Sequence, residues 1–240
     1  MKIGRISIKV IAIMTILCLV GCNSNTSSKT VGSIAYNVCS DENLVYVKEG
    51  NVYTPFIVVT NNYSKGDTLL LRKEVMEESL RMNEYSSYYN NSEIDNFLNN
   101  EYYETLGEIQ SKINSTTISI TTDDSIGISG SNTESIERYV FLLSSKELCF
   151  DMGDEGVELK YFKDPENRIG HLHNSPSGWI LRTPNTYYLS GVCSVGASGK
   201  LGTINSYDKS GIRPAFCVDS STRIIMKEGV INEKEVYVLE

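Results

Sequence analysis

The stretches WILRTPN (residues 179–185) and GIRPAFCVD (residues 211–219) decide the fold of this chain. Both are mainly apolar and typical of buried strands, yet each contains one arginine, Arg182 or Arg213, and a proline. A buried guanidinium needs carboxylates or several carbonyl oxygens around it, because an uncompensated buried charge is costly. We therefore expect both arginines to be structural, with their five N–H donors tying irregular loops to a sheet. Binding of an anionic ligand is the alternative.

The two stretches together resemble the hallmark of a widespread, uncharacterised bacterial domain family. That hallmark is Trp-Trp-Leu-Arg-Ser/Thr-Pro-Gly, then a hairpin with Gly at its tip, then Gly-Val-Arg-Pro-Ala-Phe. Two upstream segments, NNSEIDNFLNNEYYETL (90–106) and VFLLSSKEL (140–148), follow the order of the family, so the resemblance covers about residues 50 to 219. Ile180 stands where the family has its second Trp, and Asn185 stands where it has Gly.

Members of this family are similar in pattern to the C-type-lectin-like fold of sulfatase-modifying-factor relatives. The resemblance implies an α+β domain over residues 31–219, with antiparallel strands, one or two helices and long irregular loops. The best helix pattern begins after Ser92, a good N-cap residue, and can end at Gly107. A weaker helix is expected over 76–80. Residues 220–240 predict a C-terminal strand hairpin of the same domain.

The first 22 residues are typical of an exported bacterial lipoprotein. Three positive charges precede an apolar run over residues 10–20, which is short for crossing a membrane. The tetrapeptide Leu19-Val20-Gly21-Cys22 resembles the lipobox, which implies a lipoprotein signal peptide over 1–21 and lipidation of Cys22. A lipid-anchored tether over 22–30 would then hold the domain on the outer side of the cell membrane, as in a Gram-positive source. An ordinary secretory signal with a chance cysteine is the alternative.

The charge balance argues against nucleic acid as a partner. Without residues 1–21 the chain keeps 19 Lys and Arg against 30 Asp and Glu, a net charge of −11. Binding to nucleic acid depends on basic patches that neutralise phosphates, and so acidic a chain is a poor candidate for it.

Four cysteines remain besides Cys18 in the signal and Cys22, namely Cys39, Cys149, Cys193 and Cys217. Export places them where disulfides persist, and four cysteines allow three pairings that the sequence does not rank. Cys193 and Cys217 lie in expected strands and are the candidate disulfide pair. A reactive pair of these two would instead indicate an oxidoreductase similar to the sulfatase-modifying factors.

Other chemistry is not indicated. The chain has no Gly-x-Ser-x-Gly elbow, and GASGKLG (196–202) lacks the spacing of a phosphate-binding loop. His171 and His173 are too few ligands to specify a metal site. We expect no catalytic residue, no metal and no cofactor.

The 15 tyrosines point to binding instead. Several flank the expected helix or follow WILRTPN, where exposed aromatic rings can stack on sugars or anchor a protein. The candidate ligand-binding residues are Trp179, Asn185, Tyr187 and Tyr188. We expect a binding or adhesion module for a glycan or protein ligand on the cell surface; the alternatives are the oxidoreductase and a purely structural envelope lipoprotein.

Overall fold

The structure is a computed structural model that describes residues 29–34, 41–128, 132–231 and 234–240. The signal peptide expected over 1–21, the lipidation residue Cys22, nearly all of the 22–30 tether and Cys39 lie outside the described residues. Within the described ranges, none of the helices is long and apolar enough to cross a membrane.

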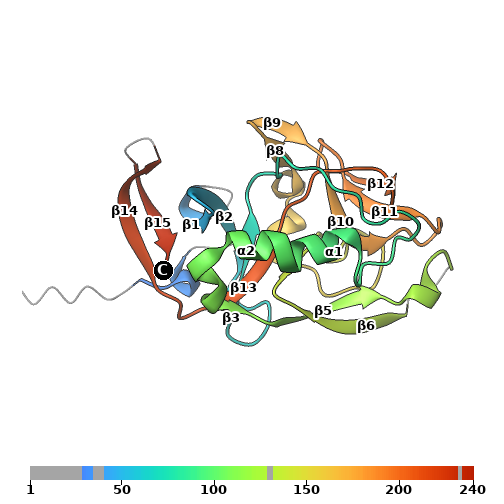
Figure 1. The fold of residues 1–240 in the computed structure, drawn as a ribbon, viewed down its shortest axis with the longest axis horizontal. Coiled ribbons are helices and arrows are strands. Elements are labelled where there is room, and N and C mark those ends of the chain that lie inside the picture. Colours follow the sequence, from blue (N-terminus) through green and yellow to red (C-terminus); the bar gives the residue numbers. More distant parts are fainter. Residues whose placement is uncertain (1–28, 35–40, 129–131, 232–233) are drawn as a thin grey trace, which may run out of the picture.

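A curled sheet of eight strands forms the body of the molecule (Figure 1). Its order is β14-β15-β1-β2-β3-β13-β4, and β7 also pairs with β13. The sheet is mixed, because β1 and β15 are parallel while the other pairs are antiparallel. The strands are β1 (Leu44–Glu49), β2 (Val52–Thr60), β3 (Asp67–Arg72), β4 (Ile113–Asn114), β7 (Val140–Phe141), β13 (Ala215–Asp219), β14 (Ile224–Ile231) and β15 (Lys234–Leu239).

Three smaller sheets lie beside the main sheet. They are β10 (Trp179–Pro184), β11 (Gly191–Val195) and β12 (Leu201–Asn205); β5 (Thr116–Thr121) and β6 (Thr133–Arg138); and β8 (Gly170–Leu172) and β9 (Ser175–Ser177). The helical segments are short. They are α1 (Glu93–Phe97), a π-helical stretch η3 (Leu98–Tyr102), α2 (Tyr103–Thr105) and the 3-10 segments η1 (Val31–Ser33), η2 (Asp41–Asn43), η4 (Gly107–Lys112), η5 (Asp123–Ser125), η6 (Lys160–Lys163) and η7 (Pro165–Arg168).

The expected α+β, C-type-lectin-like fold is wrong, because the structure is mostly β. Ser92 does cap a helix, since its side chain accepts a hydrogen bond from the Asp95 amide. The segment 76–80 forms no helix. Its backbone is bonded to a distant segment instead, with Met76 N–H donating to Ile212 and Leu80 N–H to Ser210. Five residues with helical spacing are too few to outweigh such long-range pairing.

Strand β13, the last five residues of GIRPAFCVD, lies between β3 on one side and β4 and β7 on the other. Its first four residues are fully buried. A continuous apolar run suits a strand that is covered on both faces, which explains the absence of alternation here. The Phe216 ring packs on Phe56 of β2 with centroids 5.2 Å apart, so β13 connects the motif to the core.

The two motif stretches contact each other. Trp179 forms a parallel bridge with Gly211, where an added Cβ would lie 2.3 Å from a methyl group of Val75. Only glycine permits this approach. The guanidinium of Arg213 lies 4.8 Å from the Trp179 ring centroid, and its Nε donates to the Arg72 carbonyl at 3.0 Å. Burial lowers the pKa of Arg213 to about 10, so the group stays charged at neutral pH.

Arg182 is bonded quite differently. Its two terminal nitrogens donate to the two carboxylate oxygens of Glu147 at 2.8 Å each, and both residues are buried. The remaining donors reach the carbonyls of Ser119 and Leu142. Burial alone would lower the pKa of Arg182, but the charge and hydrogen bonds of Glu147 outweigh burial and raise it. Arg182 thereby joins β10 to β5 and to the segment after β7.

Replacing Arg182 with Met should lower the free energy of unfolding by about 3–5 kcal/mol, because Glu147 would remain buried without its counter-charge. The urea denaturation midpoint measures the loss. Adding Glu147→Gln should restore part of the stability, since it removes the stranded charge.

Arg223→Met is the matched control, because its ion pair with Glu240 is exposed and 3.9 Å long. It should cost no more than about 1 kcal/mol. Equal midpoints for the Arg182 and Arg223 variants would contradict the structural role of Arg182.

Candidate ligand-binding site

The loop between β10 and β11, residues 185–190, is shaped by Asn185. The Asn185 amide nitrogen donates to the Thr203 hydroxyl at 2.8 Å, and its oxygen accepts from the Tyr187 amide at 2.8 Å. Such a side-chain bond two residues along the chain fixes a tight turn. The turn places Tyr187 and Tyr188 on the outside of the loop, 72% and 65% exposed.

Two of the four expected ligand-binding residues are therefore reassigned. Trp179 is fully buried, and its indole nitrogen donates to the Arg168 carbonyl at 3.0 Å. Asn185 is only 3% exposed, and its amide is engaged within the fold. Both residues hold the loop and the strand beneath it, whereas Tyr187 and Tyr188 remain accessible to a ligand.

Three further segments meet this loop. The Ser87 hydroxyl donates to the Leu189 carbonyl at 2.9 Å, and the Ser206 amide donates to the Ser190 carbonyl at 2.7 Å. Gly127 lies against the Leu189 side chain. Each segment adds an exposed apolar residue. The tyrosine surface, as we name it, comprises Tyr85, Ile128, Tyr187, Tyr188, Leu189 and Tyr207.

A polar hollow of about 220 Å³ adjoins Tyr187. Its side-chain functional groups come from Lys146, Asp151, Asp154 and Thr186. An aromatic ring beside carboxylates, an ammonium and a hydroxyl combines a stacking surface with donors and acceptors, which is the chemistry that sugar hydroxyl groups require.

Gly153 belongs to the loop 151–154, which lines the hollow. Its φ is +74°, and an added Cβ would lie 2.8 Å from the Thr183 side chain. Beneath it, the Ser145 hydroxyl donates to the Met152 carbonyl, and the Ser145 amide donates to the Thr183 hydroxyl at 3.0 Å. The loop 151–154 is thus fixed on buried strand β10, so the hollow is held in shape without a ligand.

Glu155 completes the support below this loop. It is fully buried and accepts hydrogen bonds from the amide and hydroxyl of Thr121 at 2.8 Å and from the Thr183 hydroxyl. Burial raises the pKa of Glu155, while the charge of Arg182 and the hydrogen bonds from both threonines oppose the rise. Glu155 is inaccessible to a ligand and acts as part of the scaffold.

The cysteines do not form the expected pair. Cys193 in β11 and Cys217 in β13 are buried free thiols in different sheets. Burial raises the pKa of Cys193 to about 12 and also raises that of Cys217. Cys149 is half-buried and free, and burial with the nearby charge of Glu158 raises its pKa as well. A reactive pair needs thiolate character, which these environments oppose.

The histidines lie apart from the hollow. His171 is in β8, and the ring of His173 lies 2.9 Å from the Glu77 carboxylate on the surface. Across the described residues, no group of three or more His, Cys, Asp or Glu side chains is arranged to hold a metal ion.

Sequence reasoning separated exposed and buried tyrosines only in part. Tyr89 and Tyr102 belong to the core, and Tyr88 donates to Glu134. Ile128, Leu189 and Tyr207 were missed, because a lone apolar residue in a polar loop carries no periodic signal. Only the contacts among the four segments bring these residues together.

The fold and the site define a mostly β domain with an exposed aromatic surface beside a polar hollow. A family model, the domain of unknown function DUF6273, matches residues 65–220, so the chain belongs to that family. The expected membership of an uncharacterised domain family is thereby confirmed. No curated protein and no solved structure matches the chain. The family match assigns no enzymatic activity.

Alkylation should distinguish the three described thiols. In the folded protein we expect iodoacetamide to label Cys149 first, because it is the only one of the three that is not fully buried. Cys193 and Cys217 should react only after unfolding in urea, since burial both hides them and raises their pKa. Peptide mass spectrometry reads out each site. Rapid labelling of Cys193 or Cys217 in the folded protein, or a disulfide between them, would contradict this assignment.

Proposed function

We propose that this protein is a bacterial cell-surface lipoprotein that binds an extracellular glycan at the tyrosine surface and the adjoining hollow. Tyr187, 72% exposed and lining the hollow, is the observation that carries the proposal. Signal peptide cleavage before Cys22 and lipidation of Cys22 would place the domain on the outer side of the membrane.

The arrangement of the molecule supports this orientation. The described chain begins beside the C-terminal hairpin, where the Lys29 carbonyl accepts from the Ile224 amide at 3.0 Å. Strands β10, β11 and β12 lie at the opposite end of the molecule (Figure 1). A lipid at Cys22 would therefore leave the tyrosine surface pointing away from the bilayer, where a cell-wall or host glycan is accessible.

A glycan is favoured over a protein ligand by the polarity of the hollow. The lining of this space of about 220 Å³ is almost entirely polar, so it offers hydrogen-bond partners to sugar hydroxyl groups and little apolar contact to a protein side chain. A protein ligand would need a larger apolar contact across the whole tyrosine surface.

The two other functions are less well supported. An oxidoreductase similar to the sulfatase-modifying factors would need an accessible thiolate, whereas Cys193 and Cys217 are buried thiols in different sheets. A purely structural envelope protein has no need of exposed tyrosines beside a preformed hollow. Six exposed apolar residues at one end of a domain are costly for solubility unless they contact something.

A screen against immobilised glycans and cell-wall fragments tests the proposal, using the chain from residue 22 onward with Cys22→Ser so that it carries no lipid. Tyr187→Ala should weaken binding at least roughly fivefold, because truncating an aromatic contact residue at the centre of a site commonly costs more than ~1 kcal/mol. Asp151→Asn should weaken binding without loss of stability, since Asp151 is exposed on the rim of the hollow.

Tyr139→Ala is the matched control, because Tyr139 is 43% exposed but lies outside the tyrosine surface. It should bind as the parent does. Equal affinities for the Tyr187 and Tyr139 variants would place the glycan elsewhere. Binding to none of the glycans and fragments would favour a structural envelope role.

A further inference from the structure

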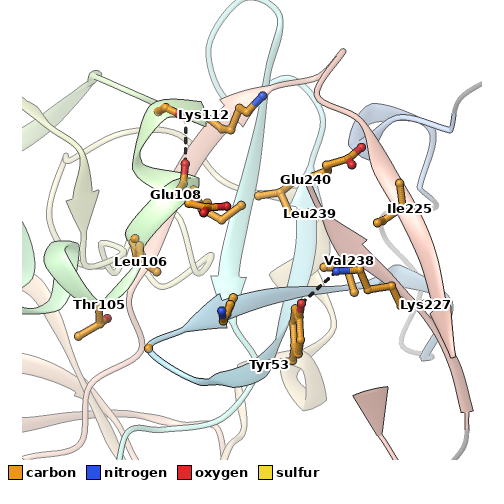
Figure 2. A pocket seen from close by; sticks show the side chains of 15 residues that line it. Tyr53, Thr105, Leu106, Glu108, Lys112, Ile225, Lys227, Val238, Leu239 and Glu240 are labelled. Atoms are coloured by element: carbon orange, nitrogen blue, oxygen red, sulfur yellow. Dashed lines mark hydrogen bonds between the residues drawn. The ribbon is translucent and has the colours of Figure 1, made fainter. Parts of the chain in front are cut away.

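A second cavity lies at the other end of the molecule, beneath the C-terminal hairpin. Its volume is about 570 Å³, within the usual range for ligand sites. One face of the main sheet forms a wall, with Ile225 and Val238 opposite each other on β14 and β15. Figure 2 shows the second wall, built from Thr105, Leu106, Glu108 and Lys112 at the end of the helical region, with Tyr53 of β2 below.

The cavity combines an apolar interior with lysines that have no acidic partner. Its apolar lining comes from Leu106, Ile109, Ile225, Val238 and Leu239. Lys48, Lys112 and Lys227 also line it, and within the described part of the chain none of the three forms an ion pair. The Lys227 ammonium donates to the Tyr53 hydroxyl at 3.1 Å, which orients it along the cavity edge.

Two acidic residues reduce the positive charge of the cavity only in part. Glu240 lies 3.9 Å from Arg223, an exposed residue outside the lining that offsets its charge in part. Glu108 is the other glutamate in the lining. Three lysines against two glutamates leave a small local excess of positive charge in a chain whose net charge is −8. That asymmetry favours an anionic ligand at this end.

The position of the cavity identifies the source of the anion. Lys29, at the start of the described chain, lies with its ammonium 3.9 Å from the ring centroid of Tyr237 in β15, and Thr30 forms a bridge with Arg223. Six residues separate Lys29 from Cys22, so the seven residue steps between them span at most about 24 Å of extended chain. A lipid on Cys22 would therefore hold the cavity close to the bilayer surface.

We propose that this cavity docks the domain on the membrane by binding the headgroup of an anionic phospholipid. The phosphodiester would lie among Lys48, Lys112 and Lys227, and the glycerol with the first methylenes of the acyl chains would contact the apolar lining. This inference goes beyond glycan binding and rests on the proposed function only for the position of the anchor. Docking would fix the orientation that the polar tether leaves free.

Vesicle co-sedimentation tests the inference without lipidation. The chain from residue 22 with Cys22→Ser should pellet with vesicles of phosphatidylcholine mixed with phosphatidylglycerol, and not with phosphatidylcholine alone. The triple substitution Lys48→Gln, Lys112→Gln and Lys227→Gln should weaken pelleting by up to about 100-fold, since each lysine at an anionic surface contributes roughly fivefold. Glu108→Gln should strengthen it about fivefold, which a merely structural role would not produce.

A second triple substitution is the matched control. Lys65→Gln, Lys160→Gln and Lys209→Gln remove the same charge from exposed positions outside the cavity and should leave pelleting close to that of the parent. Equal loss in the two triple variants, equal pelleting with neutral vesicles, or no pelleting of the parent would each overturn the proposal.

Two further measurements separate the alternatives. If soluble glycerophosphoglycerol, the deacylated form of phosphatidylglycerol, binds the parent as tightly as the mixed vesicles do, the ligand is a free phosphodiester, and membrane docking is overturned. Tyr187→Ala should pellet as the parent does, because it lies at the other end of the molecule. If the parent binds vesicles but no glycan, the proposed function alone is overturned. If the parent binds a glycan but no vesicles, this inference alone is overturned.

Discussion

The ion pair between Arg182 and Glu147 is the interaction on which the irregular half of the structure depends. Between β7 and β8 the described chain runs through residues 142–169 with no strand, so no ladder of backbone bonds fixes it. Arg182 fixes this segment instead, because its guanidinium donates to both the Glu147 carboxylate and the Leu142 carbonyl. Ser145 and Glu155 then attach the rest of the segment to Thr183 of β10, and the Ser144 hydroxyl donates to the Glu155 carbonyl within the segment. The rim of the hollow follows from their positions.

Arg213 is also a buried charge that needs compensating partners, and its partners differ from those of Arg182. Its neighbours are the Trp179 ring and one backbone carbonyl, and within the described residues its Nη1 atom has no hydrogen-bond partner. A cation over a buried indole recovers only ~2 kcal/mol or somewhat more, which explains why burial dominates and the pKa of Arg213 falls. Arg182 has a bidentate carboxylate, and its pKa rises. Arg182 in β10 thus forms the stronger tie and Arg213, two residues before β13, the weaker one.

Local chemistry was predictable from the sequence, and long-range pairing was not. The helix cap at Ser92, the burial of both arginines and the need for carboxylate or carbonyl partners follow from residue type and immediate neighbours. The fold class failed because apolar alternation identifies strands without stating which strands pair, and here β13 is bonded to β3, β4 and β7 from three distant parts of the chain. The burial of Trp179 and the exposure of Tyr187, eight residues apart, depend on that assembly and are not visible in either residue alone.

The tyrosine surface lies wholly within the region matched by the family, whereas the cavity beneath the hairpin is built from both sides of its boundary, because Leu106, Glu108 and Lys112 of the lining fall inside the match. Residues 65–220 contain the tyrosine surface, the hollow and both buried arginines. Strands β1, β2, β14 and β15 precede or follow the match, and they supply Lys48, Tyr53, Lys227 and Val238 to the cavity beneath the hairpin. The parallel pairing of β15 with β1 builds these strands into the same sheet as β13, and the bridge between Trp179 and Gly211 connects β10 to the segment that leads into β13. A fixed angle between the two ends of the molecule would turn docking at one end into a defined presentation of tyrosines at the other, which neither the anchor nor the binding surface could achieve by itself.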